Sequence, residues 1–313
     1  MKIVFMGTPP IAAYMLEQIF LSQEHDIVGV VTVQDKKVGR GQKIQESAVK
    51  QMAIHLSIPV AQPEKLKSPE FLETLVSWNA DAFVVVAFRM LPQSVWSLPK
   101  KGCINLHASL LPQYRGAAPI NWAIINGEKT TGVTTFLIEQ EIDTGQIIEQ
   151  VKIGIGENET AGVLHDKIMV QGAKTVISTL QKLESGNYTP LVQDETVDLK
   201  PAPKIFKPDC LISFSKSARE LHHFIQGLSP YPGAYLNLTY KGKELSLKIF
   251  ETRIVSEAKM AIQPKLTIET KSLFLEYAGG KLEIKDLQMQ GKRRIIAEEF
   301  IPGFEVEKAE IPT

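Results

Sequence analysis

Asn105 and His107 are the side chains in this sequence best suited to acyl-transfer chemistry. They stand two residues apart at the end of an apolar run, so in a β-strand both would point to one face, away from Leu106. An amide donor beside an imidazole can stabilise an oxyanion and handle a proton. A structural histidine whose ring is satisfied near a turn fits the same spacing, so the spacing alone leaves both interpretations open.

Asp143 is a third candidate, because it follows an apolar run and precedes Thr144-Gly145. Its carboxylate could orient His107 and favour the charged imidazole. It could equally form an Asx turn, in which the carboxylate caps nearby backbone amides. Taken alone, the Asx turn is the simpler interpretation.

Motifs for nucleotide phosphates and metals do not match. Gly7 stands alone in the N-terminal turn, where a dinucleotide fingerprint needs three glycines, and residues 40–43 lack the context of a P-loop. Cys103 and Cys210 are far apart, and neither belongs to a CxxC pair. Two cysteines are too few for a disulfide scaffold. We therefore expect neither a metal site nor the usual binding of NAD or ATP.

The elements that must position these residues alternate between strands and helices in the first half. Such alternation is typical of a doubly wound, mostly parallel Rossmann-like sheet. Apolar runs that predict strands cover residues 3–6, 27–33, 81–88, 102–107 and 132–138. Helical spacing of apolar residues predicts a first helix over 11–20 and one long helix over 160–185.

The second half has a different pattern. Four prolines interrupt the chain before a short helix over 218–226 and several alternating strands joined by tight turns. This pattern indicates a small antiparallel barrel of the OB type, so the fold class is α/β with a C-terminal OB-like β-barrel. We expect a catalytic domain over 1–188, a linker over 189–208 and a barrel domain over 209–313.

Composition limits the partners. The chain has 313 residues, 44% of them hydrophobic, and a net charge of +0, so any nucleic acid would have to bind local basic patches. Residues 36–50 carry five basic side chains and one acidic, and residues 281–296 carry five and two. No signal peptide or apolar segment approaching the ~20 residues of a membrane span is present. We expect a cytoplasmic protein with no membrane contact.

The run from Asn105 through Ser109-Leu110-Leu111-Pro112 to residues 114–119, with Asp143-Thr144-Gly145 downstream, resembles the formyltetrahydrofolate-dependent formyltransferases. Residues 1–9 and 84–88 are also similar to that family. In the second half, residues 202–205, 228–234 and 287–292 resemble the members that act on initiator methionyl-tRNA. The resemblance spans nearly the whole chain.

The resemblance implies a reaction. The donor would be 10-formyltetrahydrofolate and the acceptor the α-amino group of methionine on initiator methionyl-tRNA. Asn105 would donate a hydrogen bond to the tetrahedral oxyanion, protonated His107 would stabilise its charge, and Asp143 would hold the imidazolium. No metal takes part, and we expect a monomer.

The resemblance also implies two binding sites. The folate-binding residues would be Phe88, Arg89, Met90, Leu91, Ser109, Leu110, Leu111, Pro112, Ile138 and Ile142. The tRNA-binding residues would be Lys36, Lys37, Arg40, Lys43, Lys292 and Arg293. The run Phe88–Pro92 is one residue shorter than is usual in the family and lacks its tyrosine-glycine pair, and Gln226 stands where an arginine is common.

Two alternatives remain open at this point. The first is a folate-dependent enzyme that formylates a small amine, such as an amino sugar nucleotide or glycinamide ribonucleotide, or hydrolyses the donor. The second is a non-catalytic RNA-binding relative. The retained Asn105, His107 and Asp143 argue against the second, and the linker with its additional barrel argues against the first.

Overall fold

The structure is a computed structural model that describes residues 1–38, 43–259 and 262–312. Its described residues form two compact units, each discontinuous in sequence. The first comprises 1–116, 131–153 and 167–201, and the second comprises 117–130, 154–166 and 202–313. Two segments that precede residue 188, namely 117–130 and 154–166, therefore belong to the second unit, whereas the domains expected from the sequence were each continuous.

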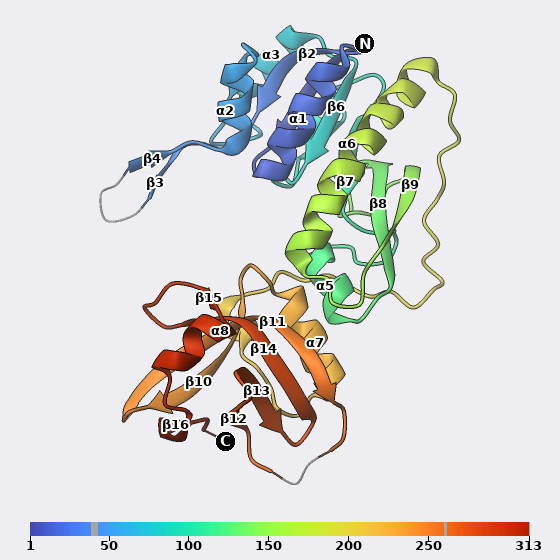
Figure 1. Cartoon of the computed structure of the whole chain (residues 1–313). Coiled ribbons are helices and arrows are strands. Elements are labelled where there is room, and N and C mark those ends of the chain that lie inside the picture. The colour runs from blue at the N-terminus through green and yellow to red at the C-terminus, as the bar shows by residue number, and fades with distance from the viewer. Residues whose placement is uncertain (39–42, 260–261, 313) are drawn as a thin grey trace. The chain divides into compact units, whose positions relative to one another are not determined.

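The first unit is built on a sheet whose described strands run in the order β5-β2-β1-β6-β7-β8-β9 (Figure 1). Strands β5, β2, β1, β6 and β7 pair in parallel, and β7 pairs with β8 in the antiparallel sense. The predicted Rossmann-like, mostly parallel sheet is confirmed. The strand bounds are β1 Lys2–Gly7, β2 Asp26–Val31, β5 Val60–Ala61, β6 Ala82–Val86, β7 Cys103–His107, β8 Thr130–Leu137 and β9 Ile147–Gly154.

Helices cover both faces of this sheet because its central strands are apolar on both sides. Gly172 of α6 lies so close to Met15 of α1 and Leu106 of β7 that these elements pack on one face, where Figure 1 shows α1 and α6 side by side. On the other face, Phe71 of α3 packs with Val4 and Cys103 of the strands. The bounds are α1 Pro10–Ser22, α2 Ala48–His55, α3 Pro69–Trp78, α4 Gln93–Trp96 and α6 Ala161–Ser185.

A short two-stranded hairpin extends from the first unit, formed by β3 (Lys36–Val38) and β4 (Lys43–Gln45). In the second unit the strands run in the order β12-β13-β14-β11-β10-β16 and form a nearly closed antiparallel barrel. The predicted C-terminal barrel is confirmed. The bounds are β10 Ala234–Tyr240, β11 Lys243–Ser256, β12 Lys265–Glu269, β13 Ser272–Tyr277, β14 Gly280–Met289, β15 Ile295–Ile296 and β16 Ala309–Glu310.

Two helices of the second unit pack against each other beside this barrel. Gly227 at the end of α7 approaches the backbone of Asn121 and Ile125 in α5, which leaves no room for a larger side chain. The buried face of α7 contributes Leu221 and Ile225 to the apolar core of the barrel. The helix bounds are α5 Pro119–Ile125, α7 Ala218–Gly227 and α8 Ala297–Phe300, with short 3-10 turns at Lys207–Cys210, Ile301–Gly303 and Val306–Lys308.

Candidate active site

His107 is the last residue of β7, and its ring is held between two oxygen atoms. Its Nε2 lies 2.8 Å from the carbonyl oxygen of Tyr114, and its Nδ1 lies 3.7 Å from Oδ2 of Asp143. The side chain is buried. Because both ring nitrogens face acceptor oxygens, the arrangement suits an imidazolium, in which both nitrogens are donors.

Asn105 points to the same face of β7 as His107, because side chains alternate along a strand. Cys103, two residues earlier, packs in the apolar cluster beneath α3 and α4, which identifies that face. Asn105 is half-buried, and within the described residues its side-chain amide forms no hydrogen bond. That amide is therefore available to donate to a ligand.

Asp143 adopts a left-handed backbone conformation, with a φ of 57°. Its Oδ2 accepts a hydrogen bond from the backbone N–H of Gly116 at 3.0 Å, in addition to facing His107. In the described part of the chain it caps no amide of its own turn, so the carboxylate serves a distant segment and not a local Asx turn. The structure thus brings two candidate residues together that are 36 positions apart.

The loop between His107 and Gly116 is fastened to the sheet. Thr134 on β8 donates its hydroxyl to the carbonyl of Ser109 at 2.6 Å and accepts from the N–H of Leu111 at 3.2 Å. Gln150 on β9 donates to the carbonyl of Leu111 at 2.7 Å. Ser109 itself is buried and donates its hydroxyl to the carbonyl of Gln113. These contacts fix the backbone that carries the acceptor for His107.

Three of the predicted folate-binding residues belong to one apolar cluster. Leu91 is buried in it, and Phe88 and Ile138 pack against its edge. Two others lie at the surface, since Met90 is 70% exposed and Ile142 is 60% exposed. Exposed apolar side chains beside a buried cluster are suited to covering an aromatic ligand.

The remaining predicted folate-binding residues lie in other environments. Leu111 is buried with Phe136 and Ile147, and Leu110 packs so closely on Gly132 that a side chain there would clash. Arg89 donates to the carbonyls of residues 63 and 64 and lies over the ring of its neighbour at position 88. Pro112 is half-buried.

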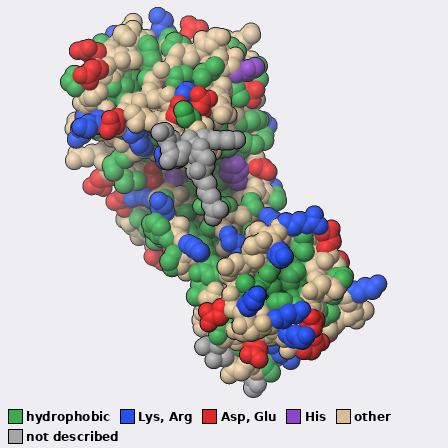
Figure 2. Space-filling view, turned by 90° about the vertical axis from the view of Figure 1, so that its left-hand side faces the viewer, with side chains coloured by type: hydrophobic (Ala, Val, Ile, Leu, Met, Phe, Trp, Pro, Cys, Tyr) green, Lys and Arg blue, Asp and Glu red, His purple; other side chains and the backbone are tan. Residues whose placement is uncertain are grey.

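The predicted tRNA-binding residues lie on two separate elements. Lys36, Lys37 and Lys43 belong to the β3–β4 hairpin, and Lys36 is exposed; Arg40 lies outside the described residues. On the barrel, Lys292 is exposed and Arg293 forms an ion pair with Glu299 at 3.4 Å. Lys and Arg side chains lie across the face of the second unit that Figure 2 presents, interspersed with acidic ones.

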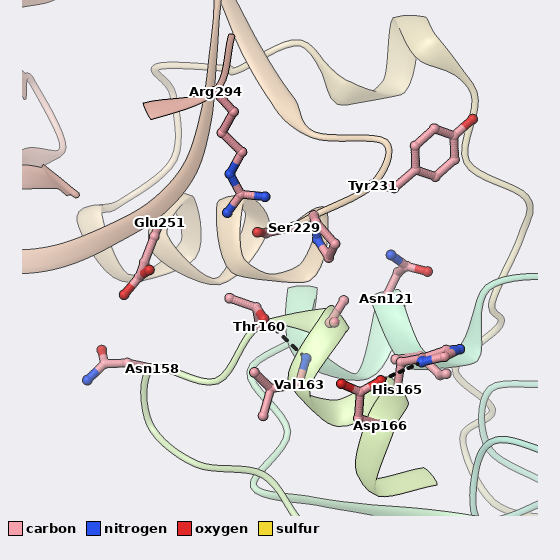
Figure 3. A pocket seen from close by; sticks show the side chains of 14 residues that line it. Asn121, Asn158, Thr160, Val163, His165, Asp166, Ser229, Tyr231, Glu251 and Arg294 are labelled. Carbon is pink, nitrogen blue, oxygen red and sulfur yellow. Dashed lines mark hydrogen bonds and ion pairs between the residues drawn. The ribbon is translucent and has the colours of Figure 1, made fainter. Parts of the chain in front are cut away.

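The second unit contains a cavity of about 700 Å³ that includes none of the predicted site residues. In Figure 3, Arg294 and Glu251 extend towards it from the barrel, and Asn121 and Tyr231 lie on the opposite side. Arg294 is already engaged by Asp286 through two hydrogen bonds of 2.9 Å. The cavity therefore offers no unpaired arginine to an anion.

The sequence analysis did not identify Gln193, a buried residue of the predicted linker that contacts the loop of Asp143. Its Nε2 lies 2.8 Å from the carbonyl oxygens of both Asp143 and Gly145. Its Oε1 accepts two hydrogen bonds from Arg115. No local pattern surrounds Gln193 in the sequence, and its partners lie about 50 and 78 positions away.

The described residues contain neither a candidate metal site nor a helix that could span a membrane. Their His, Cys, Asp and Glu side chains form no group of three or more that could hold a metal ion. Each helix among them is too short or too polar to cross a membrane.

The chain is similar to known families and proteins over nearly its whole length. Residues 1–180 match the family model described as "Formyl transferase", and residues 204–305 match the one described as "Formyl transferase, C-terminal domain". A methionyl-tRNA formyltransferase from Azobacteroides pseudotrichonymphae genomovar. CFP2 is 47% identical over 310 residues, covering 96% of this chain and 95% of the relative. One from Flavobacterium psychrophilum is 46% identical over 304 residues, covering 97% and 96%.

A solved structure agrees at the level of the fold. The N-formyltransferase from Helicobacter canadensis, in complex with folinic acid and dTDP-3-aminofucose, aligns with a TM-score of 0.61 at 20% identity. The alignment covers 91% of this chain and 98% of that one. The likeness therefore extends across both units of the chain.

Proposed function

This chain belongs to the formyl transferase family, and we propose that it transfers the formyl group of 10-formyltetrahydrofolate to methionyl initiator tRNA. The acceptor is the α-amino group of the esterified methionine. The observation that carries this proposal is the juxtaposition of His107 and Asp143, with the amide of Asn105, which has no partner among the described residues, on the same strand face as His107. Relatives bearing the name methionyl-tRNA formyltransferase, similar over nearly the full length, support the choice of acceptor.

The first step is attack of the amine nitrogen on the formyl carbon, which forms a C–N bond and leaves a negative charge on the formyl oxygen. Asn105 donates a hydrogen bond from its side-chain amide to that oxygen. His107, protonated on both nitrogens, stabilises the same charge. Donors already aimed at a developing oxyanion need no reorganisation, which is why they lower the barrier.

The second step breaks the bond between the formyl carbon and N10 of the folate. Asp143 holds the imidazolium of His107. Through water, it also assists the transfer of a proton from the attacking nitrogen and the transfer of a proton to N10. The products are the N-formylated amine and tetrahydrofolate. The folate is thus a substrate of the reaction, and the three residues supply orientation, charge and protons.

The donor site is assigned to the apolar surface beside the catalytic residues. Phe88, Leu91 and Ile138 form its inner wall, and the exposed Met90 and Ile142 border it. Leu110, Leu111 and Pro112 belong to the loop that begins after His107, and they border the donor site on the side of the reacting group. An apolar wall with a few polar groups is the usual form of a site for a flat heterocycle.

The tRNA is bound by basic residues on two elements, the β3–β4 hairpin with Lys36 and the barrel with Lys292 and Arg293. Such patches neutralise phosphates without requiring a net positive protein. The catalytic residues all come from one chain, so we expect an active monomer in the cytoplasm, where initiator tRNA is used.

A formyl-transfer assay with four acceptors tests this function. Purified protein and 10-formyltetrahydrofolate are offered methionyl initiator tRNA, methionyl elongator tRNA, free methionine and an amino sugar nucleotide. We expect formylation of methionyl initiator tRNA well above the other three. Formylation of the amino sugar nucleotide alone would identify the chain as a small-amine enzyme of the same family.

A further inference from the structure

The segment 191–200, predicted as part of a linker, is bound along the active site of the first unit. Ile147 and Leu191 exchange two backbone hydrogen bonds of 2.8 and 2.9 Å. The N–H of Tyr114 donates to the carbonyl of Lys200 at 2.7 Å, and Gln113 donates to the carbonyl of Asp198. The segment therefore holds the loop that supplies the acceptor for His107.

Gln193 lies at the centre of this segment with every polar atom of its side chain engaged. Its amide nitrogen donates both hydrogens, one to the carbonyl of Asp143 and one to that of Gly145. Its amide oxygen accepts from Nε and Nη2 of Arg115 at 3.1 and 2.7 Å. The side chain is 6% exposed, so these hydrogen bonds are shielded from water and replace those that burial removes.

These contacts join the two segments that build the site. The carbonyls that Gln193 binds flank Thr144, so the backbone on both sides of the turn is fixed while Asp143 keeps its left-handed conformation. Arg115 stands between Tyr114, whose carbonyl accepts from His107, and Gly116, whose N–H donates to Asp143. One side chain thus contacts both the segment that holds the carboxylate and the segment that holds the partner of the imidazole.

We propose that Gln193 is a positioning residue that holds the Asp143 carboxylate opposite His107 during formyl transfer. The inference rests on the proposed function, because it assigns Gln193 to the geometry of that reaction. A misplacement of about 1 Å in a catalytic group can slow a reaction by about 10²-fold. The bound substrates are not contacted by Gln193 in this account, so its loss acts on the chemical step.

The test is the substitution Gln193→Glu. It keeps the length of the side chain and an acceptor for Arg115, but it removes both N–H donors. The new carboxylate would also lie against the carbonyl oxygens of Asp143 and Gly145, which repel it. We expect kcat to fall by about 10- to 100-fold, with the KM of both substrates nearly unchanged. Glu195→Gln is the matched control, because Glu195 pairs with Arg115 from an exposed position and does not contact the Asp143 turn. That variant should turn over at the wild-type rate.

A double-mutant cycle separates positioning from general support of the fold. Gln193→Glu in the Asp143→Ala background should cause little further loss of kcat, because no carboxylate remains to be positioned. If Gln193→Glu does not fold, Gln193→Met keeps the length without the charge and enters the same cycle. Losses that multiply in the double variant, or wild-type kcat in the folded single variant, would overturn the inference.

The activity of the wild type shows whether a negative result contradicts the positioning role of Gln193 or the proposed function itself. A wild type that formylates methionyl initiator tRNA beside an equally active Gln193 variant contradicts only the positioning role. A wild type that does not formylate that tRNA contradicts the function and the inference that depends on it.

Discussion

Asn105 presents an amide that no group in the described residues engages, whereas the polar groups around it are paired. A half-buried amide without a partner costs little while water reaches it, and it gains a strong partner when an oxyanion forms beside it. His107 and Asp143 are organised before any substrate arrives. The proposed mechanism therefore relies on the amide of Asn105 and on the contact of 3.7 Å between the His107 ring and the Asp143 carboxylate.

Met90 provides a test of the folate site at the level of a single side chain. Because Met90 is exposed, Met90→Glu should leave the melting temperature unchanged while placing a charge beside the donor site. We expect the KM for the folate to rise by about 10-fold or more, and the KM for tRNA to stay constant. Kinetics with each substrate varied in turn would measure this.

Val76→Glu is the matched control, since Val76 on α3 is also an exposed apolar residue, at 63%. It should change neither KM. An unchanged folate KM in Met90→Glu would place the donor site elsewhere.

Gly145 provides a test of the turn that carries Asp143. An added methyl group there would overlap the carbonyl oxygen of Leu137, which is backbone and cannot rotate away. Gly145→Ala should therefore displace the turn and lower kcat by about 10-fold or more. Unfolding followed by circular dichroism should show that the overpacking lowers the free energy of unfolding by roughly 1–3 kcal/mol.

Gly154→Ala serves as the comparison, because in the described part of the chain no atom beyond the adjacent residues lies within 4 Å of the added methyl group. Its kcat should equal that of the wild type. Equal activity in Gly145→Ala would show that the Asp143 turn tolerates displacement.

The residues of the site differed in how far sequence could predict them. The two-residue spacing of Asn105 and His107 fixes a common strand face, and that is a local property. The local pattern at Asp143 favoured an Asx turn, because its true partners, Gly116 and His107, lie far away in the chain. Gln193 had no local signal at all, since its role consists entirely of contacts with distant residues.

Among the elements, the direction of strand β8 could not be predicted from the sequence. An apolar run predicts that a strand is buried but not its direction, and β8 pairs with β7 antiparallel. This arrangement brings Thr134 opposite His107, where its hydroxyl fastens the loop after the strand. Strand β9 adds Gln150 to the same anchor, and no expected strand covered it.

Helix α7 carries a buried histidine that should make the protein sensitive to acid. Burial, and to a smaller extent the neighbouring His223, lower the pKa of His222 from 6.5 to about 4. Between these values the unfolded chain binds more protons than the folded one, so the free energy of unfolding falls as pH decreases. The contribution lost by pH 5 is roughly 2 kcal/mol.

Thermal melting between pH 7 and pH 5 checks this prediction by comparing slopes. Burial also lowers the pKa values of His25 and His223, so the wild type retains some acid sensitivity from them. His222→Gln should show a smaller decrease in melting temperature than the wild type. The exposed His55→Gln should match the wild-type slope, and identical slopes for His222→Gln would contradict the assignment.

At the scale of the whole molecule, a protein of zero net charge must bind RNA through local patches. Lys36 on the β3–β4 hairpin and Lys292 on the barrel are exposed and belong to separate units. If each contacts one phosphate, Lys36→Ala and Lys292→Ala should each reduce the slope of log affinity against log salt by about 0.7–0.9. The sequence predicts the same for Arg40→Ala.

Filter binding of methionyl initiator tRNA across a salt series measures those slopes. Lys100→Ala, which removes an exposed lysine outside both patches, is the control and should retain the wild-type slope. Superimposable curves for the wild type and the Lys36 or Lys292 variants would show that these side chains do not contact phosphate.

If this chain formylates methionyl initiator tRNA with Asn105 as an oxyanion donor, one kinetic comparison should show both properties. The most direct measurement is the single-turnover rate of formyl transfer to that tRNA, at saturating folate, for the wild type and Asn105→Ala. The wild type should form formylmethionyl-tRNA, and loss of the donor should slow the step by about 10²- to 10³-fold with an unchanged melting temperature. Equal rates for the two proteins, or no transfer by the wild type, would contradict the account.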